Sequence, residues 1–476
     1  MTTREGSAEI GVYGMGTMGA NLALNIAEKG FATAIANRTA QKAHDVRAEA
    51  GTLGERLVVA EDAAELVASL STPRIVILMV NAGQPVDDQL AVFRPLLSAG
   101  DIIVDAGNAD FNDTVRRTAS MEGTGIHFVG MGVSGGELGA RHGPSIMVGG
   151  PADIYPRLEP VLSAIAARYE GVPCVAHLGP DGAGHFVKTI HNGIEYADMQ
   201  MIGEIYGIMR DGLALDAGAM ATIFSRWNEG GLSSYLVEIT AVVLAETDPQ
   251  TGGPLVDLIV DEAGQKGTGR WAVIEAQKLG VGATTLEAAV SARGVSSRRA
   301  ERQAAAALYP NVASEPHGFS GDTAGIAELE QALETAKIIA YAQGFATMQA
   351  ASQEYGWNLP LGEIALIWRA GCIIRSRFLD DIAKAYDAGD VQNLLQSPHF
   401  VERVTRGEGA LRRVVAKAAL AGIAAPALSA ALAYFDDYRR ARGTTNLTQG
   451  QRDLFGAHTF HRLDREGVFH HQWPAV

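Results

Sequence analysis

The chain has little cysteine and no long apolar run. Cys174 and Cys372 are the 2 cysteines among its 476 residues, and they lack the spacing of a metal site. Neither a disulfide framework nor a structural zinc site is therefore expected. The strongest apolar run near the N-terminus, residues 75–80, suits a buried strand and is far shorter than the roughly 20 residues of a membrane span. With no apolar leader before it, we expect a cytoplasmic protein without a membrane partner.

Basic residues are outnumbered by acidic ones. The 39 Lys and Arg residues against 54 Asp and Glu residues give a formal net charge of −15. Nucleic acids and anionic membranes attract basic surfaces, so neither is expected as the main partner. A small phosphorylated substrate needs only a few local cations and is compatible with this charge. The hydrophobic share of 47% and charged share of 20% are typical of a folded globular chain.

The chain divides by hydrophobic period into two kinds of segment. Short apolar runs alternate with amphipathic stretches up to about residue 180, at residues 9–13, 32–36, 74–80, 102–105, 127–129 and 145–148. This alternation predicts βαβ units in a parallel sheet. From a glycine-rich turn at residues 179–184 the apolar spacing becomes helical, and it ends near Gly443. We predict an α/β domain over 1–181, a large all-α domain over 182–442 and an extended C-terminal arm over 443–476 that lacks a helical period.

A glycine fingerprint follows the first predicted strand. Its residues are Gly14, Met15, Gly16, Thr17, Met18 and Gly19, and an amphipathic stretch begins directly after them. In a Rossmann-like fold such glycines let the backbone approach a pyrophosphate at the positive end of a helix. The alternative is a merely tight turn between strand and helix. The strand before the motif and the helix after it favour a dinucleotide site.

The end of the second predicted strand indicates which dinucleotide is bound. The sequence there is Asn37, Arg38 and Thr39, without the carboxylate that usually binds the ribose 2′-hydroxyl of NAD. An amide, a guanidinium and a hydroxyl suit a 2′-phosphate, so NADP is favoured. The alternative is that Arg38 is an ordinary surface arginine.

The helix predicted to open the second domain carries a stripe of polar groups. Lys188, His191, Asn192, Glu195 and Tyr196 are spaced so that they share one face over two turns. Apolar neighbours indicate that this helix is otherwise packed, which argues against the alternative of a solvated, salt-bridged face. The stripe is therefore a candidate catalytic site.

Two loops at predicted strand ends could complete that site. Ser134, Gly135 and Gly136 offer a hydroxyl and backbone N–H groups suited to a carboxylate. Asn108 follows another strand, at the sheet edge where open α/β folds bind ligands. Flexible or strand-terminal turns are the alternatives for both loops.

Four segments resemble the decarboxylating 6-phosphogluconate dehydrogenases, a family of the β-hydroxyacid dehydrogenase superfamily. They are VSGGELGARHGPSIMVGG (133–150), GAGHFVKTIHNGIEYADMQMI (182–202), AGQKGTGRW (263–271) and QRDLFGAHTF (451–460). The resemblance covers nearly the whole chain. It implies an NADP-linked homodimer with a Rossmann coenzyme domain, a helical substrate and dimerisation domain, and an arm that reaches the partner's active site.

The resemblance also implies a role for each matching residue. Lys188 matches the general base and Glu195 the general acid. Asn108, Ser134, Gly135, Gly136, His191 and Asn192 match positions around the substrate carboxylate and reacting hydroxyl. The phosphate end is matched by Tyr196, Lys266, Thr268, Arg293, Arg452 and His458. Val80, Asn81, Ala82 and Asn108 join the glycine fingerprint and residues 37–39 as cofactor-binding candidates, although Asn81 stands where many members have lysine.

The implied reaction is the oxidative decarboxylation of 6-phosphogluconate to ribulose 5-phosphate, carbon dioxide and NADPH. A lysine that is neutral because desolvation and nearby cations lower its pKa can take the proton of the carbon-3 hydroxyl while hydride leaves. A protonated glutamic acid can then protonate carbon 1. No metal is expected. The alternatives are another β-hydroxyacid dehydrogenase acting on a smaller unphosphorylated acid, and a non-catalytic NADP-binding regulator.

Overall fold

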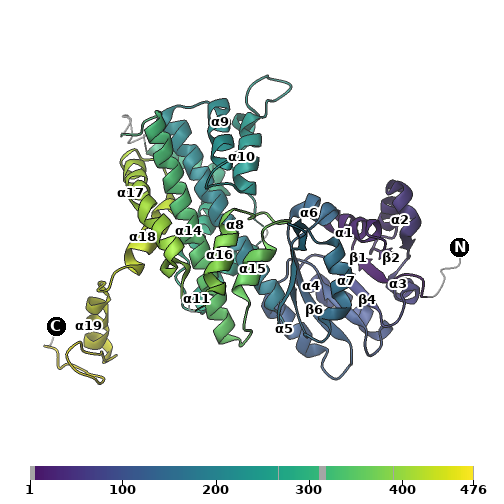
Figure 1. Ribbon diagram of the computed structural model, residues 1–476. Coiled ribbons are helices and arrows are strands. Elements are labelled where there is room, and N and C mark those ends of the chain that lie inside the picture. Colours follow the sequence, from purple (N-terminus) through teal and green to yellow (C-terminus); the bar gives the residue numbers. More distant parts are fainter. Residues whose placement is uncertain (1–5, 266, 310–317, 390, 475–476) are drawn as a thin grey trace. The chain divides into compact units, whose positions relative to one another are not determined.

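A single eight-stranded sheet forms the N-terminal part of the computed structural model (Figure 1). Its strands lie in the order β10-β7-β6-β5-β4-β1-β2-β3. Their bounds are β1 Ile10–Tyr13, β2 Thr33–Ala36, β3 Leu57–Val59, β4 Ile75–Leu78, β5 Ile102–Asp105, β6 His127–Val133, β7 Ile146–Gly149 and β10 Val175–Gly179. Each predicted strand is present, whereas β3 and β10 were not predicted. The short strands β8 (Arg168–Tyr169) and β9 (Val172–Pro173), which form a separate two-stranded sheet, were not predicted either.

The prediction of a wholly parallel sheet is wrong at one edge. β6 pairs with β7 in the antiparallel sense, and β10 runs parallel to β7. The connection between β6 and β7 holds only α6 (Gly136–His142), a helix of 7 residues. A parallel pair needs a longer crossover, so this short connection returns the chain along the sheet in the opposite direction.

Helices cover both faces of the sheet, which explains why its strands are apolar on both sides. They are α1 Thr17–Glu28, α2 Gln41–Glu49, α3 Ala63–Ser69, α4 Gln84–Phe93, α5 Phe111–Ser120 and α7 Tyr155–Ile165. One buried cluster joins Val12 of β1 to Leu22 of α1. The other joins Tyr13, the next residue of the same strand, to Phe93 of α4. Neighbouring residues of β1 therefore point into opposite cores.

The second domain is helical, as predicted. It begins with α8 (Ala183–Gly207) directly after the glycine-rich turn at 179–184. The long α14 (Thr323–Glu354) packs against α8 and α17 (Pro398–Leu420), and it is buried along most of its length. The other helices are α9 Ala217–Asn228, α10 Tyr235–Ala245, α11 Thr268–Lys278, α12 Thr284–Ser296, α13 Arg299–Leu308, α15 Leu361–Ile367, α16 Phe378–Asp387 and α18 Pro426–Tyr438.

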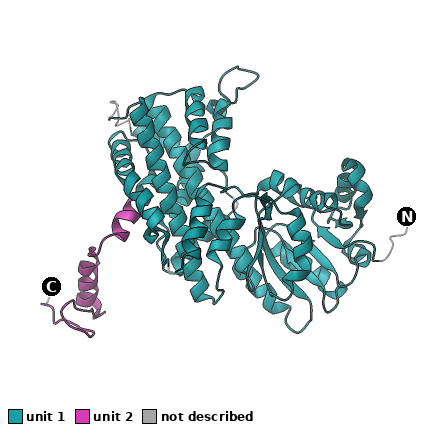
Figure 2. Ribbon diagram, viewed as in Figure 1, with its two compact units in different colours: residues 1–431 teal, residues 432–476 magenta. Residues whose placement is uncertain are grey.

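The structure describes residues 6–265, 267–309, 318–389 and 391–474, and it divides into two compact units between Ala431 and Leu432 (Figure 2). Within the C-terminal unit, the expectation of a segment without helical structure is wrong, because α19 spans Thr445–Gly456. The apolar positions of this short helix are too few to show a period in the sequence. No helix in the described residues is both long and apolar enough to cross a membrane.

The C-terminal unit is organised around the buried carboxylate of Asp453. It accepts hydrogen bonds from the backbone N–H groups of Thr459 (2.9 Å) and His471 (3.0 Å) and from the indole of Trp473 (2.8 Å). Phe460 and Phe469 form an antiparallel bridge within the same segment. Residues after α19 therefore fold back on that helix instead of extending from it.

Candidate active site

The glycine fingerprint combines two packing glycines with one that faces open space. A Cβ on Gly14 would lie 2.4 Å from the carbonyl oxygen of Met79, and one on Gly19 would lie 1.8 Å from that of Gly14. A Cβ on Gly16 would meet nothing within 4 Å. Gly14 and Gly19 are thus required by the fold. Gly16 keeps the N-terminus of α1, which has no side-chain cap, open to a ligand.

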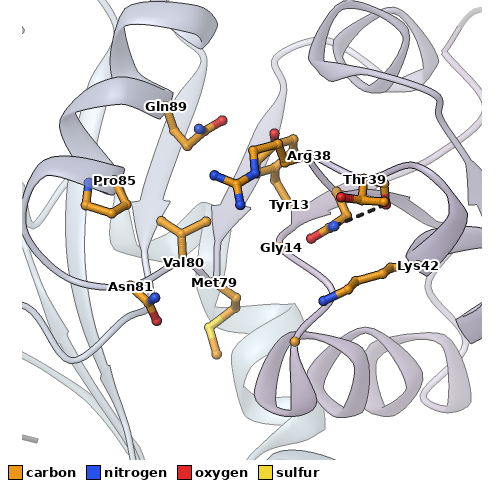
Figure 3. Close-up of a pocket in the computed structure, with 12 residues that line it drawn as sticks. Tyr13, Gly14, Arg38, Thr39, Lys42, Met79, Val80, Asn81, Pro85 and Gln89 are labelled. Carbon is orange, nitrogen blue, oxygen red and sulfur yellow. Dashed lines mark hydrogen bonds between the residues drawn. The ribbon is translucent and has the colours of Figure 1, made fainter.

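Next to this loop is a cavity of about 280 Å³ with basic residues in its lining. Arg38 and Lys42 lie on one side, and Val80, Asn81 and Gln89 lie on the facing side (Figure 3). Both cations are exposed, and no acidic partner binds either of them among the described residues. The cavity can therefore take an anionic group at the end of β2.

Asn37 has a different task from its neighbour Arg38. Its side-chain oxygen accepts the N–H of Met15 (2.9 Å), and its amide donates to the carbonyl of Thr39 (3.1 Å). These bonds tie the end of β2 to the glycine loop. Asn37 thus shapes the coenzyme cavity with its side chain already engaged, and Arg38 and Lys42 supply the charge.

A second cavity, of about 610 Å³, continues along the carboxyl edge of the sheet. Its lining includes the predicted residues Thr17, Met18, Val80, Asn81, Ala82 and Asn108. Trp271 of α11 also lines it, so the helical domain closes one side. All the predicted coenzyme residues except Met15 therefore line one of two cavities, which share Gly16, Met79, Val80 and Asn81. Met15 is buried in the core of the sheet domain instead.

Helix α8 reaches the sheet because glycines remove the side chains between them. A Cβ on Gly132 of β6 would lie 2.5 Å from the Cβ of Lys188. A Cβ on Gly130 would lie 2.8 Å from His185 Nδ1, and one on Gly184 would lie 2.5 Å from Met147 O. The first turns of α8 consequently pack on bare backbone, and this contact places Lys188 beside the loop that follows β6.

Four of the predicted site residues meet at this contact. Lys188 Nζ donates to Asn192 Oδ1 (2.8 Å) and Ser134 Oγ (3.2 Å), and it lies 3.4 Å from His191 Nδ1. Ser134 Oγ lies 3.1 Å from His191 Nε2. All four residues are buried, and Glu195 Oε2 lies 3.9 Å from His191 Nδ1.

Burial shifts the acid–base behaviour of this cluster. Desolvation lowers the pKa of Lys188, against the opposing influence of Glu195 and Cys372. The expectation that nearby cations help to lower this pKa is not borne out by the described residues, because the charges acting on Lys188 are those of acidic groups. Desolvation also raises the pKa of Glu195 above its ordinary value. A neutral lysine and a protonated carboxyl group are thus favoured on one helix face.

The residues predicted for the phosphate end gather at the junction of α8, α11 and α12. The guanidinium of Arg293 stacks on the ring of Tyr196, 4.4 Å from its centroid, and donates to the carbonyl of Gly264 (2.9 Å). Tyr196 packs against Gly269, next to the buried Thr268. Lys266 lies outside the described residues.

The two remaining predicted residues belong to the C-terminal unit. Arg452 is on α19 and donates to Gln449 Oε1 (3.1 Å). His458 follows the helix, and its ring lies 5.8 Å from that of Phe455. Desolvation acts to raise the pKa of the nearby Asp453, but the hydrogen bonds from His471, His470 and Trp473 hold it below its ordinary value. These bonds keep Arg452 and His458 on one folded segment.

Several residues at the site were not predicted from the sequence, among them Lys42, Trp271 and Cys372. Lys42 was recoverable as a second cation four residues after Arg38, at the start of α2. Trp271 and Cys372 carry no local signal, because tertiary packing alone brings them to the site. Cys372 Sγ donates to Trp368 O (3.0 Å), and burial raises its pKa to about 12. No group of metal-binding side chains occurs in the described part of the chain.

A dinucleotide cavity at the sheet edge, next to a buried lysine on a helix of a second domain, defines a coenzyme-dependent oxidoreductase. Family models match residues 9–179 as the NAD-binding domain of 6-phosphogluconate dehydrogenase and residues 184–473 as its C-terminal domain. The chain belongs to the 6-phosphogluconate dehydrogenase family.

Several relatives and a solved structure are similar to this chain over nearly its full length. A Synechococcus elongatus protein named 6-phosphogluconate dehydrogenase, decarboxylating, is 49% identical over 98% of this chain and 99% of its own. Two Bacillus subtilis relatives, 46% and 45% identical over the same shares, are named NADP(+)-dependent and NAD(+)-dependent decarboxylating 6-phosphogluconate dehydrogenases. A Plasmodium falciparum 6-phosphogluconate dehydrogenase, described with NADP+ and with 6-phosphogluconate, is 40% identical with a TM-score of 0.93, covering 98% of this chain and 100% of its own.

Proposed function

We propose that this chain catalyses the NADP-dependent oxidative decarboxylation of 6-phosphogluconate to ribulose 5-phosphate, carbon dioxide and NADPH. The observation that carries the proposal is the buried Lys188 on the same helix face as Glu195, beside the cavity that Asn108 lines. We assign residues 1–181 to coenzyme binding, 182–442 to substrate binding and dimerisation, and 443–476 to an arm. The reaction takes place in the cytoplasm, where this coenzyme is available and buried cysteines stay reduced.

The residues of the first cavity fit NADP. The uncapped start of α1 and the open space at Gly16 suit a pyrophosphate, and Arg38 with Lys42 suits a 2′-phosphate. Since relatives of nearly equal identity are named for either coenzyme, these two cations are the reason for choosing NADP. The bound coenzyme supplies a hydride acceptor.

Lys188 acts first as a base and then as an acid. Its neutral amine takes the proton of the carbon-3 hydroxyl as hydride leaves carbon 3, and a β-keto acid results. The ammonium then passes its proton to the new carbonyl oxygen, and the electron pair of the carbon–carbon bond that breaks as carbon dioxide leaves forms an enediol. Lys188 takes that proton back when carbon 1 is protonated. Asn192 and Ser134, within 3.2 Å of Nζ, hold the amine in place for both steps.

Glu195 completes the reaction by protonating carbon 1. Its protonated state is favoured by burial, and its position two turns along α8 from Lys188 separates the acid from the base. The substrate carboxylate is held by the loop at Ser134, Gly135 and Gly136. Its phosphate is bound by Tyr196, Thr268 and Arg293, together with Lys266 and with Arg452 and His458 of a partner subunit in a homodimer.

A direct assay tests the proposal. Purified protein is mixed with 6-phosphogluconate and NADP, the nicotinamide absorbance is followed, and released carbon dioxide is trapped in parallel. We expect equal amounts of NADPH and carbon dioxide. Reduction without carbon dioxide, or turnover only with an unphosphorylated hydroxy acid, would contradict the proposal, and coenzyme binding without turnover would indicate an inert regulator.

A further inference from the structure

A second buried lysine lies on α14, which packs against α8. Lys337 of α14 is fully buried, and its Nζ lies 2.9 Å from Oδ1 of Asp198, which is 1% exposed. Asp198 follows Glu195 by three residues and therefore lies one helical turn away on the same side of α8. A buried ion pair of this kind usually stabilises a fold no better than two apolar residues would. Its position next to the acid of the proposed mechanism suggests another use.

The surroundings of Asp198 leave its charge largely uncompensated by hydrogen bonds. Neither of its oxygens has an aligned hydrogen-bond donor within the described residues, so the ion pair with Lys337 alone balances it. Lys337 is held in turn by Ser234 Oγ (3.3 Å), which caps α10. The negative field of Asp198 can therefore act on neighbouring groups of α8.

Glu204, farther along the same helix, shows the contrasting arrangement. Its buried carboxylate accepts the backbone N–H groups of Ala427 (2.8 Å) and Leu428 (2.9 Å) at the start of α18. The Glu204 carboxylate thus caps the N-terminus of α18, which is a structural role. Glu204 thus provides a matched buried acid on α8 that lies outside the active site.

We propose that Asp198 and Lys337 are positioning residues for the protonation of carbon 1: Lys337 holds Asp198 in a buried ion pair, and the Asp198 carboxylate keeps the proton on Glu195 until the substrate takes it. This inference rests on the proposed role of Glu195. A second negative charge one turn from Asp198 is unfavourable, so the neutral form of Glu195 persists.

The charges around Glu195 support this assignment. Burial raises the pKa of Glu195, the positive charges of Lys188 and Arg293 lower it, and the negative charge of Asp198 raises it again. The other titratable groups that face Glu195 or Asp198 are His191 on α8, Cys372 after α15, and Tyr341 on α14. Asp198 is therefore the one acidic side chain in this set of described neighbours that opposes the two cations.

The test is the pH dependence of kcat in the full-length enzyme with saturating NADP and 6-phosphogluconate. The acid limb reports the lysine that must be neutral, and the alkaline limb reports the acid that must be protonated. The variants are Asp198→Asn and the double variant Asp198→Asn/Lys337→Met, which removes both charges and leaves no unpaired ion. Glu204→Gln is the matched control, and thermal unfolding verifies that each variant is folded.

Removing both charges in the double variant should shift the alkaline limb to lower pH by about one unit, given like charges roughly 6 Å apart, an effective dielectric constant near 20 and partial cancellation by Lys337. Asp198→Asn alone, which leaves Lys337 charged, should shift it further in the same direction. The acid limb should stay in place, and Glu204→Gln should move neither limb. An unchanged alkaline limb in the folded double variant would overturn the inference. Glu195→Gln distinguishes the role of Glu195 as the acid from the effect of Asp198 on it. If the residual turnover of Glu195→Gln keeps the alkaline limb, the limb does not report Glu195, and its role as the acid is refuted.

Discussion

The preference for NADP should depend on Arg38. This exposed guanidinium lines the 280 Å³ cavity at the end of β2 and has no acidic partner among the described residues. A charge-assisted hydrogen bond contributes about 1.5–3 kcal/mol, and the exposure of Arg38 favours the lower half of that range. Arg38→Ala should therefore raise the KM for NADP roughly 10–30-fold. The KM for NAD, which lacks the 2′-phosphate, should change little.

The assay compares KM for both coenzymes at saturating 6-phosphogluconate in the unaltered enzyme, Arg38→Ala and Arg47→Ala. Arg47 is a matched control, because it is an exposed arginine of α2 that does not line the cavity. Raising the salt concentration should weaken NADP binding more in the unaltered enzyme than in Arg38→Ala. Equal losses for the two coenzymes, or an unaltered enzyme that prefers NAD, would refute the assignment of Arg38 to the 2′-phosphate.

Other consequences can be measured with single variants. Lys188→Ala should lower kcat by at least about 10²–10⁴ while coenzyme fluorescence still reports binding; near-normal turnover would exclude it as the base. If Arg452 acts in the partner's site, inactive Lys188→Ala and Arg452→Ala chains that are refolded together should regain up to one working site per mixed dimer. Mass spectrometry verifies that mixed dimers have formed. If these mixed dimers stay inactive, the arm serves its own subunit. Gly16→Ala should weaken coenzyme binding and leave the free energy of urea unfolding unchanged. Gly19→Ala, whose Cβ would overlap Gly14 O, should lower the free energy of unfolding by about 2 kcal/mol or more. A larger loss of stability in Gly16→Ala than in Gly19→Ala would contradict the packing argument. Asp87 accepts hydrogen bonds from arginine side chains, which lower its pKa from 3.8 to about 2 in the folded protein. After solvent screening, its ionised form should therefore stabilise the protein by about 1 kcal/mol above pH 5, and this stabilisation should be lost as the pH falls toward 2. Asp87→Asn should lower the free energy of unfolding by this amount at pH 7 and by progressively less below pH 5.

Much of the coenzyme domain was predictable because its signals are local. Strand length, the spacing of the glycines and the absent carboxylate at residues 37–39 each appear within a few residues of sequence. β3 was missed because it has only 3 residues. The strand β7 was predicted, but its antiparallel direction was not, because strand direction depends on how the chain returns. The role of Asn37 in tying the loop to β2 is likewise visible only in the folded backbone.

The catalytic stripe was predictable as a helix face, but its chemistry was only partly so. Helical spacing brings Lys188 and Glu195 to one side, whereas the burial that shifts both pKa values comes from the packing of α8 against elements distant in sequence. Cys372 and Trp271 reach the site through tertiary contacts between distant segments. The helix α19 was missed because its fold depends on Asp453 gathering donors from the residues that follow it.

The contact between α8 and β6 also determines how this enzyme can be dissected or recombined. A fragment ending near Gly179 would retain β6 but would lose the helix that covers Gly130 and Gly132, leaving the backbone of this strand uncovered. Exchange of coenzyme domains between homologous enzymes would succeed only if the first turns of α8 are carried along. The unit that can be transplanted is therefore the sheet together with the start of its catalytic helix, and a useful crossover point lies within α8, after Asn192.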